Sequence, residues 1–277
     1  LFALAFSAAE PEALKRDLAR LKPIEPVQAL ATFTVKPGFR IELAAAEPLV
    51  TDPVAMAFDE NSRLFVVEMI GYSEHRDDRL GQVRLLEDEN GDGRYDRSTI
   101  YAGDLAWPTA IVCHDGGVFI GATPDILFLK DTDGDQKADE RRVIFTGIGD
   151  GVNRLNMQSL MNSFRWGYDN RIHGTASGTP GKVRVVGKPE RGTITFRRGD
   201  FSFDPRVLDF RLESGGAQHG MDFDVAGRKF VCSNSHHIQQ VMYERRYARV
   251  NPNFSPPSPV VDIPVDGASA TVFRLSP

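Results

Sequence analysis

The sequence predicts an all-β protein built as a β-propeller of four-stranded blades, with a short helix before it. Two observations lead to this fold. From residue 31 onward, brief apolar runs rich in Val, Ile and Phe are separated by Gly, Asp, Asn and Pro, which is typical of strands and turns. Several of these segments also repeat one another, and four-stranded sheets repeated around an axis define a propeller. We therefore expect residues 31–277 to form the propeller.

The N-terminal segment differs from the rest of the chain. It opens with LFALAFSAAEPEA, an apolar run followed by small residues that resembles the end of a signal peptide, although a short hydrophobic helix or strand is the alternative. In residues 10–22, Leu14, Leu18 and Leu21 share one helical face before a proline ends the run. Residues 1–30 are thus predicted to be a signal-peptide remnant and a helix. The protein is expected to be exported, and to be periplasmic or membrane-associated.

Four segments follow one pattern of strand, turn and strand. They read VAMAFDENSRLFVVE (54–68), TAIVCHDGGVFIGA (109–122), NSFRWGYDNRIHGTA (162–176) and HGMDFDVAGRKFVCS (219–233). Their equivalent anchors are spaced by 54, 54 and 57 residues and are Phe58, Val112, Trp166 and Phe223. The first two repeats continue with two further strands around an acidic loop. Each repeat is therefore predicted to be one blade, and the chain to hold about four blades and the beginning of a fifth.

The first two repeats differ by an insertion of 12 residues, IGYSEHRDDRLG (70–81). It falls between the second and third predicted strands of the first blade. Insertions in repeat proteins form loops on one face, which is often the binding face. This loop is therefore a candidate for contact with a ligand.

Negative charge is concentrated in the two acidic loops. The net charge of the chain is −5, and the segments 88–96 and 131–139 each carry four acidic side chains against one basic side chain. This pattern predicts local cation sites instead of an acidic surface. The chain has no basic stripe with interleaved aromatic residues, which argues against nucleic acid as a partner.

Oxygen ligands recur at positions 1, 3, 5, 7 and 9 of both loops, which predicts two calcium sites. The ligands of the first loop are Asp88, Asn90, Asp92, the carbonyl of Arg94, and Asp96. Those of the second are Asp131, Asp133, Asp135, the carbonyl of Lys137, and Asp139. The loops are not EF-hands, because both lack the Glu at position 12 and strand-like runs flank them. Gln136 also replaces the glycine of position six, which is expected to strain the second turn and weaken binding. The alternative is a solvated acidic hairpin turn.

The two cysteines, Cys113 and Cys232, belong to no CxxC or CxxCH motif. The sequence therefore supports neither a zinc site nor a covalently attached haem. In an exported protein, a disulfide between them is one alternative. Buried free thiols are favoured, because each cysteine lies in an apolar strand-like run.

Catalytic candidates come from the loops that enter the innermost strands, because these loops converge at the channel of a propeller. Besides Asp52 and Gln218, they are Arg154, Gln158, Asn162 and His219. His219 is the best proton acceptor among them for oxidation of an alcohol near neutral pH. The alternative is a structural or merely exposed histidine. His236 and His237 are adjacent, so on a strand they point to opposite faces and are not expected to share a metal ion.

These motifs together resemble a known family. The runs FTVKPGFRIELAAAEPLVTDPVAMAFDENSRLFVVEM, GQVRLLEDENGDGRYDRSTIYAG, DILFLKDTDGDQKADERRVIFTG, NSFRWGYDNRIHG and FVCSNSHH are similar to the propeller domain of membrane-bound dehydrogenase-type proteins of planctomycetes and verrucomicrobia. Many of those proteins are described as haem-binding CxxCH proteins. The opening run is more distantly similar to the glucose/sorbosone dehydrogenases, which are six-bladed propellers.

The resemblance implies a six-bladed type of propeller, truncated here, in which residues 39–46 pair with the last blade. It also implies calcium, pyrroloquinoline quinone as the cofactor, and a cytochrome c domain downstream. The quinone-binding residues of the sugar dehydrogenases do not transfer, because neither their HxGGR-like motif nor their Arg-Asn pair is found here.

The expected function is that of a calcium-binding propeller domain of a dehydrogenase-like oxidoreductase. Its substrates would be sugars or other alcohols, and its electron acceptor a quinone or a haem. The alternative is a non-catalytic propeller, stabilised by calcium, that binds polysaccharide or a partner domain. A hydrolase or lyase on the same fold is a third option.

Overall fold

The computed structural model describes residues 22–248, 250–251 and 253–265. The chain divides into two units, Leu1–Ala46 and Glu47–Pro277. The described part of the first unit holds one turn of α-helix, α2 (Pro26–Ala29), and one 3₁₀ turn, η1 (Leu30–Thr32). The predicted signal-peptide remnant and almost all of the helix predicted over 10–22 lie outside the described residues. No helix in the described ranges is long and apolar enough to cross a membrane.

Residues 39–46, which were expected to pair with the last blade, have no regular secondary structure in the described part of the chain, and the pairing stays a prediction. A strand persists only where a neighbouring strand satisfies its backbone N–H and C=O groups. None of the strands in the described part of the chain pairs with this segment.

The first two repeats form the sheets that the sequence predicts. The first sheet has the order β1-β2-β3-β4, with β1 (Pro53–Phe58), β2 (Leu64–Glu68), β3 (Gly81–Glu87) and β4 (Arg97–Leu105). The second repeat gives β5 (Ala110–His114), β6 (Gly117–Ala122), β7 (Asp125–Lys130) and β8 (Glu140–Ile148). Neighbouring strands pair antiparallel in both. The acidic loops join β3 to β4 and β7 to β8, so they are equivalent hairpins of consecutive sheets.

The third repeat contains a hairpin that the sequence did not predict. Its own sheet has the order β14-β13-β10-β9, with β9 (Asn162–Trp166), β10 (Ile172–Thr175), β13 (Asp200–Asp204) and β14 (Asp209–Glu213). Between β10 and β13 the chain forms β11 (Gly181–Val185), the 3₁₀ turn η2 (Pro189–Arg191) and β12 (Ile194–Phe196), and β11 pairs with β8. The second sheet therefore has six strands. Gly147 permits this pairing, because a Cβ there would lie 2.1 Å from the carbonyl oxygen of Lys182.

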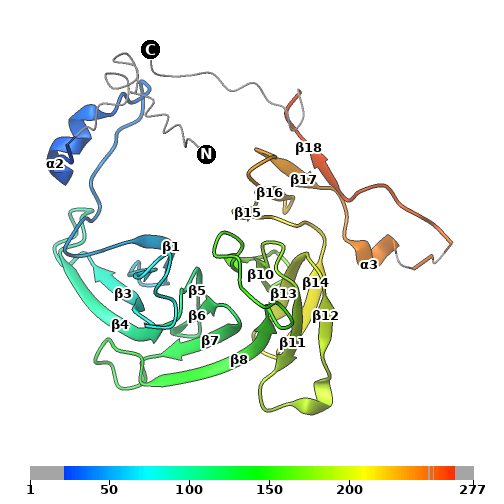
Figure 1. Ribbon diagram of the computed structural model, residues 1–277. Helices are drawn as coiled ribbons and strands as arrows, with labels where there is room; N and C mark the ends of the chain where they lie inside the picture. Colours follow the sequence, from blue (N-terminus) through cyan, green and yellow to red (C-terminus); the bar gives the residue numbers. More distant parts are fainter. Residues whose placement is uncertain (1–21, 249, 252, 266–277) are drawn as a thin grey trace, which may run out of the picture. The chain divides into compact units, whose positions relative to one another are not determined.

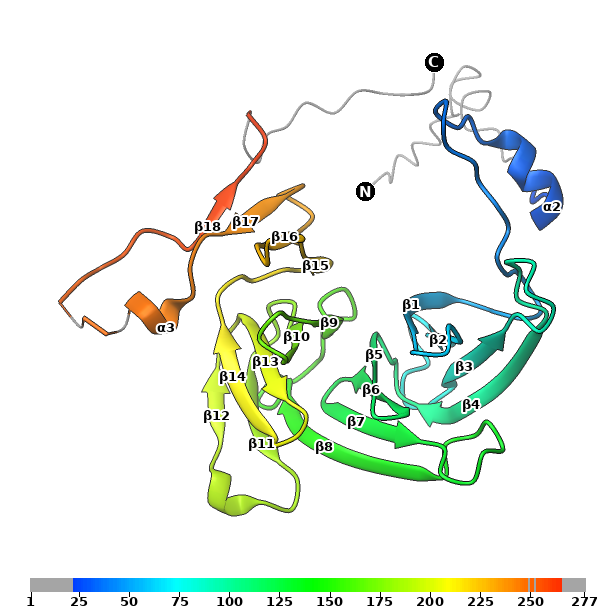
Figure 2. The same cartoon turned by 180° about the vertical axis from the view of Figure 1, so that it is seen from behind.

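The fourth repeat forms a sheet of order β15-β16-β17-β18. Its strands are β15 (Gly220–Phe223), β16 (Lys229–Cys232), β17 (Gln239–Val241) and β18 (Val260–Asp262), and the short helix α3 (Arg245–Ala248) lies between β17 and β18. Figures 1 and 2 show the four sheets following one another in sequence order, from cyan to orange.

The first strands of consecutive sheets are neighbours. β1 contacts β5, β5 contacts β9, and β9 contacts β15. One apolar core lies between the first and second sheets, and a second core, rich in Phe, lies between the second and third. In the second core the rings of Phe119 and Phe145 lie 5.1 and 5.2 Å from that of Phe203. Sheets packed face to face around neighbouring first strands are the local arrangement of propeller blades.

Two of the repeated turns carry the same polar clamp. Asp59 accepts hydrogen bonds from the backbone N–H of Arg63 at 2.8 Å and from its Nε at 2.7 Å. Asp224 does the same for Arg228, at 2.9 and 2.6 Å. A carboxylate that binds amides two to four residues ahead stabilises a tight turn. The Asp that recurs after the first strand is therefore a structural residue of the hairpin.

Candidate functional site

The four first strands line one cavity of about 580 Å³. Each of β1, β5, β9 and β15 contributes residues to the wall, from the segments 54–56, 109–111, 162–165 and 219–222. His237, which follows β16, also faces this central cavity. Nδ1 of the neighbouring His236 instead lies 2.7 Å from the carboxylate of Asp262, so the two histidine side chains have different contacts.

A second cavity of about 360 Å³ adjoins the first, because Val54, Thr109, Asn162 and His219 line both. We call it the rim cavity. Its remaining lining residues come from the residue after β2, from the insertion, from the segment before β9 and from the loops around β15 and β16, and they are Met69, Tyr72, Met157, Gln158, Leu160, Gln218 and Asn234.

Four of the six catalytic candidates, Gln218 among them, meet in the rim cavity, and Asp52 and Arg154 do not. Gln158, Asn162 and His219 line it. Arg154 is exposed and lines neither cavity. The neighbouring Leu155 explains this placement, because it packs against the buried cluster of Met69, Trp107 and Leu160. The side chain of Arg154 is thereby left in solvent.

The side chain of Asn162 links two loops by hydrogen bonds. Its Nδ2 donates to the carbonyl oxygens of Leu160 at 3.0 Å and Gln218 at 2.8 Å, and its Oδ1 accepts from the hydroxyl of Ser163 at 2.7 Å. Both ends of the amide are therefore occupied. Asn162 positions the loop before His219, and it has little capacity left to bind a ligand.

His219 is exposed at the rim, and Asn234 orients its ring. The Nε2 atom lies 2.9 Å from Oδ1 of Asn234. Since a carboxamide oxygen only accepts hydrogen bonds, Nε2 carries the proton in the neutral ring and Nδ1 keeps a lone pair. Sequence reasoning found no signal for Asn234, which comes from the SNSHH run and reaches His219 only in the folded chain.

Each acidic loop is organised by its first carboxylate. Asp88 accepts backbone hydrogen bonds from Gly91 at 2.7 Å and Gly93 at 2.8 Å. Asp131 accepts them from Gly134 at 2.7 Å and Gln136 at 2.8 Å. Three further hydrogen bonds occur at the same positions of both loops. The side chain at position 3 accepts from the backbone amide of position 5, the side chain at position 5 from that of position 7, and the side chain at position 9 from that of position 2.

The second loop gathers three carboxylates. Oxygen atoms of Asp131, Asp133 and Asp135 lie within 4.8 Å of one another. Several oxygens that converge from one flexible loop suit calcium better than magnesium, which demands a rigid octahedron and keeps its waters. The donor set therefore fits a calcium ion.

Gln136 is held in the left-handed conformation by the neighbouring sheet. Its φ is 70°, and its Nε2 donates to the carboxylate of Glu87 at 2.8 Å. The hydroxyl of Thr99 donates to its Oε1 at 3.4 Å. These contacts to the first sheet offset part of the strain that the sequence led us to expect from a non-glycine residue at this position.

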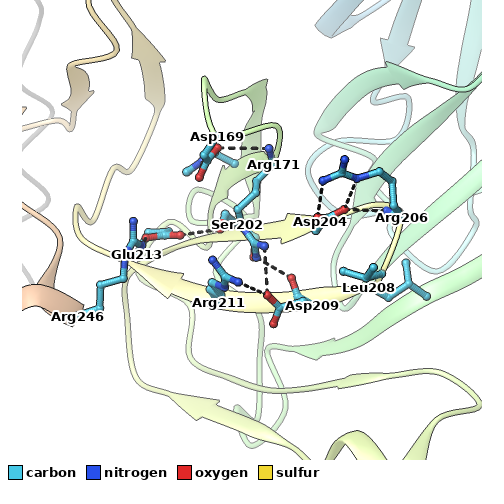
Figure 3. A network of polar contacts seen from close by, with 12 residues as sticks. Asp169, Arg171, Ser202, Asp204, Arg206, Leu208, Asp209, Arg211, Glu213 and Arg246 are labelled. Atoms are coloured by element: carbon cyan, nitrogen blue, oxygen red, sulfur yellow. Dashed lines mark hydrogen bonds and ion pairs between the residues drawn. The ribbon is translucent and has the colours of Figure 1, made fainter.

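A polar network runs along the third sheet and reaches Arg246 of α3 (Figure 3). Arg171 donates to the hydroxyl of Ser202 at 2.8 Å, and Ser202 donates to Glu213 at 2.6 Å. Arg246 forms an ion pair with the other oxygen of Glu213. The backbone N–H of Ser214 donates to the nearby carboxyl of Glu244 at 2.6 Å. Burial, and after it the charge of Glu213, raises the pKa of Glu244 to about 7, against the effect of the Ser214 amide.

The Glu244→Gln variant is expected to be more stable than the wild type at pH 8 but not at pH 4. The folded carboxyl has a pKa above that of the unfolded chain, so its contribution to stability is complete at acid pH and is lost as the pH rises through about 7. Glu244 is only half-buried, and solvent screening reduces the gain to about 1–2 kcal/mol. Urea unfolding from pH 4 to 8 measures it. Glu190→Gln, at an exposed position, is the control, and a constant difference between variant and wild type would contradict the prediction.

The two cysteines are free, and each is half-buried. Burial raises the pKa of the Cys113 thiol to about 12. This thiol stays protonated at neutral pH and is a poor nucleophile.

One protein family and two solved structures resemble this chain. The family model described as Domain of unknown function (DUF7133) matches residues 25–277. The holo form of the pyranose dehydrogenase PQQ domain from Coprinopsis cinerea superposes with a TM-score of 0.50 at 16% identity, over 75% of this chain and 47% of that chain. The chain thus spans about half the length of that domain. A Trichoderma reesei structure of Carbohydrate-Active Enzymes Family AA12 matches with a TM-score of 0.35 at 13% identity, over 67% of this chain and 58% of that chain. No curated protein matches the sequence.

Proposed function

Because this chain belongs to the family described as Domain of unknown function (DUF7133) and has a dehydrogenase-like fold, we propose that it is a propeller domain of a sugar- or alcohol-oxidising protein. The proposal includes export to the periplasm or the membrane surface. It also includes a six-bladed ring, of which the four sheets are a part, and a cytochrome c domain as a partner.

The observation that carries the proposal is the pair of adjoining cavities where the first strands converge. Cavities of about 300–1,000 Å³ are the usual size of small-molecule sites. The central cavity has about 580 Å³ and the rim cavity about 360 Å³. His219 lines both, so its side chain borders a ligand bound in either cavity.

Oxidation of an alcohol to a carbonyl removes a hydride from carbon and a proton from oxygen. In this proposal His219 accepts the proton at Nδ1, while Asn234 holds Nε2 and fixes the ring. Asn162 and Ser177 both donate to the carbonyl oxygen of Gln218, which keeps the loop before His219 in place.

The two electrons of the hydride need an acceptor, which we assign by class as a quinone, which can take up the hydride itself, or a haem, which takes up one electron at a time. Pyrroloquinoline quinone is a tricarboxylate and requires cationic partners. Among the described residues, Arg165 is the one Lys or Arg that lines the two cavities, and it is already paired with Asp222 at 3.4 Å. The described lining therefore does not fit this cofactor by itself, and no step of the proposal passes through it.

A dye-linked assay of the chain on a panel of sugars and alcohols tests the oxidative chemistry. The proposal expects reduction of the dye that depends on substrate, measured with and without added pyrroloquinoline quinone and calcium. No reduction under any of these conditions, with a folded protein, would overturn it.

The proposal also assigns one calcium ion to each acidic loop. The three converging carboxylates of the second loop support it, as does the matching hydrogen-bond scaffold of the first. The ion would neutralise charge and tie the hairpins between β3 and β4 and between β7 and β8. Its role here is stability, because both loops lie apart from the residues that line the two cavities.

Calcium is expected to raise the melting temperature of EGTA-treated protein, and magnesium at the same concentration to raise it less. A ligand present at 100 times its Kd stabilises the folded state by about 2.7 kcal/mol. Asp133→Asn and Asp135→Asn should each weaken binding at the second loop, as measured by calorimetry. Asp77→Asn changes an exposed carboxylate outside the loops and is the control. Absence of a calcium heat in the wild type would refute the assignment.

The alternative function is a non-catalytic, calcium-stabilised propeller that binds polysaccharide or a partner domain. The scarcity of cationic groups around the cavities favours it. Binding of an oligosaccharide by a protein that reduces no dye would decide for this alternative.

A further inference from the structure

The insertion over residues 70–81 is fixed to the two sheets beside it. Arg76 donates from Nη2 to the carbonyl oxygen of Thr123 at 2.7 Å, in the turn between β6 and β7. Arg79 donates from Nε to the carboxylate of Asp104 at 2.5 Å and from Nη2 to its carbonyl oxygen at 2.6 Å, at the end of β4. The loop is therefore held at two points, and its side chains have defined positions at the rim.

Tyr72 is the aromatic residue that this loop presents to the rim cavity. The residue is 54% exposed, and its ring lies 6.0 Å from the ring of the buried Trp107, at an angle of 50°. Trp107 packs with Met69 and Leu160, and its Nε1 lies 3.4 Å from the carbonyl oxygen of Gly71. The tyrosine thus has a rigid support beneath it, and it keeps free apolar surface at the cavity.

The polar groups around Tyr72 include no carboxylate, ammonium or guanidinium group. Carboxamides of Gln158, Gln218 and Asn234 line the rim cavity, with the hydroxyl of Thr109 and the imidazole of His219. Within the described residues, no Asp, Glu, Lys or Arg side chain lines it. An anionic or cationic ligand would lose hydration there without gaining a partner of opposite charge. Neutral donors and acceptors beside an aromatic ring match instead a ligand with many hydroxyl groups and an apolar face.

We propose that the rim cavity is a binding subsite for an uncharged pyranose ring, and that Tyr72 determines this specificity by stacking against the C–H face of the sugar. The inference rests on the proposed function, because the sugar in this subsite is the one whose hydroxyl faces His219. It makes the substrate class narrower than sugars and alcohols in general. It excludes uronic acids, sugar phosphates and anionic quinones from this subsite.

Binding of methyl glucoside and cellobiose tests the inference, with glucuronate, glucose 6-phosphate and pyrroloquinoline quinone as charged probes. Calorimetry gives the Kd, and tryptophan fluorescence reports on Trp107 beside the site. Tyr72→Ala should weaken binding of the neutral sugars about 3- to 10-fold, which is the usual effect of one aromatic contact. Tyr72→Phe should bind as the wild type does. Tyr168→Ala removes another exposed ring, outside both cavities, and should also bind normally.

The outcomes separate this inference from the proposed function. Binding that is equal in Tyr72→Ala and the wild type, or a preference for the charged probes, overturns the inference alone. Binding of neutral sugars that depends on the ring of residue 72, without any dye reduction, overturns the oxidative function and leaves the subsite standing. Failure of the wild type to bind any neutral sugar overturns the inference, and the proposed function falls with it only if the dye is also not reduced with any sugar or alcohol.

Discussion

The His219→Gln variant is expected to oxidise its substrate about 10²- to 10⁴-fold more slowly than the wild type, which is the usual contribution of a positioned acid or base. Glutamine keeps a polar group beside Asn234 but cannot take up a proton from a hydroxyl group. The loss should appear in kcat, because the proton is transferred only as the hydroxyl reacts. Binding of a neutral sugar, measured without the dye, should change much less.

His236→Gln is the matched control for this variant. That histidine lies in the same part of the fourth repeat, but its ring is bound to Asp262 and does not line either cavity. It should retain the activity of the wild type. Equal activity in His219→Gln and the wild type would remove His219 from the mechanism, and equal losses in the two variants would indicate a structural effect.

The repeats were predictable because their signals are local. A strand, an Asp-containing turn and a second strand lie within about 15 residues, so the sequence alone contains the hairpins. The clamps of Asp59 on Arg63 and Asp224 on Arg228 show why the same residue types recur, since each turn uses a carboxylate to bind its own backbone. The turn of the second repeat is shorter than the turns of the other repeats, because β5 ends at His114 and β6 begins at Gly117.

The hairpin of β11 and β12 was not predictable in the same way. The alternation in GKVRV identifies β11 as a strand with one buried face. It does not identify β8 as its partner, because strand pairing depends on backbone approach between segments distant in sequence. The close contact of Gly147 with Lys182 decides the pairing, whereas a glycine in an apolar run is equally typical of a bulge or a turn.

The candidate site was likewise predictable only in part. The repeat placed Gln158, Asn162 and His219 near the start of inner strands, and the structure brings them to one rim. The sequence could not show that the side-chain amide of Asn162 is already hydrogen-bonded to backbone groups. It therefore could not distinguish Asn162 from a residue that is free to bind a ligand. Tyr72 and Asn234 were missed because their roles depend on a supporting tryptophan and on a histidine far away in the sequence.

Lys229→Met is expected to destabilise the protein by about 3–5 kcal/mol, which is the usual cost of leaving one buried charge without its partner. Lys229 in β16 and Asp200 in β13 form an ion pair of 2.7 Å, and their side chains are 5% and 0% exposed. Methionine has nearly the same length but no charge, so the buried carboxyl group of Asp200 would lose its cationic partner. Urea unfolding measures the loss.

The double variant Lys229→Met/Asp200→Asn separates charge from shape. Asparagine can still accept the backbone N–H of Gly216 and Ala217, which now bind Asp200 at 3.1 and 3.2 Å. No uncompensated charge remains, so the double variant should be more stable than Lys229→Met alone. A double variant that is as unstable as the sum of the two single variants would show that the two residues do not act as a pair.

The same ion pair controls the loop that carries His219. Lys229 donates to the carbonyl oxygen of Ser214 at 2.8 Å, and Asp200 binds the amides that follow it. Gly215 must be a glycine, because a Cβ there would lie 1.9 Å from the carboxylate of Asp200. Loosening this anchor should disorder the segment from Ser214 to His219 before the sheets unfold. In the folded Lys229→Met variant, hydrogen exchange should therefore rise first at this segment, and sugar oxidation should fall with it. Unchanged exchange there would limit the ion pair to a role in global stability.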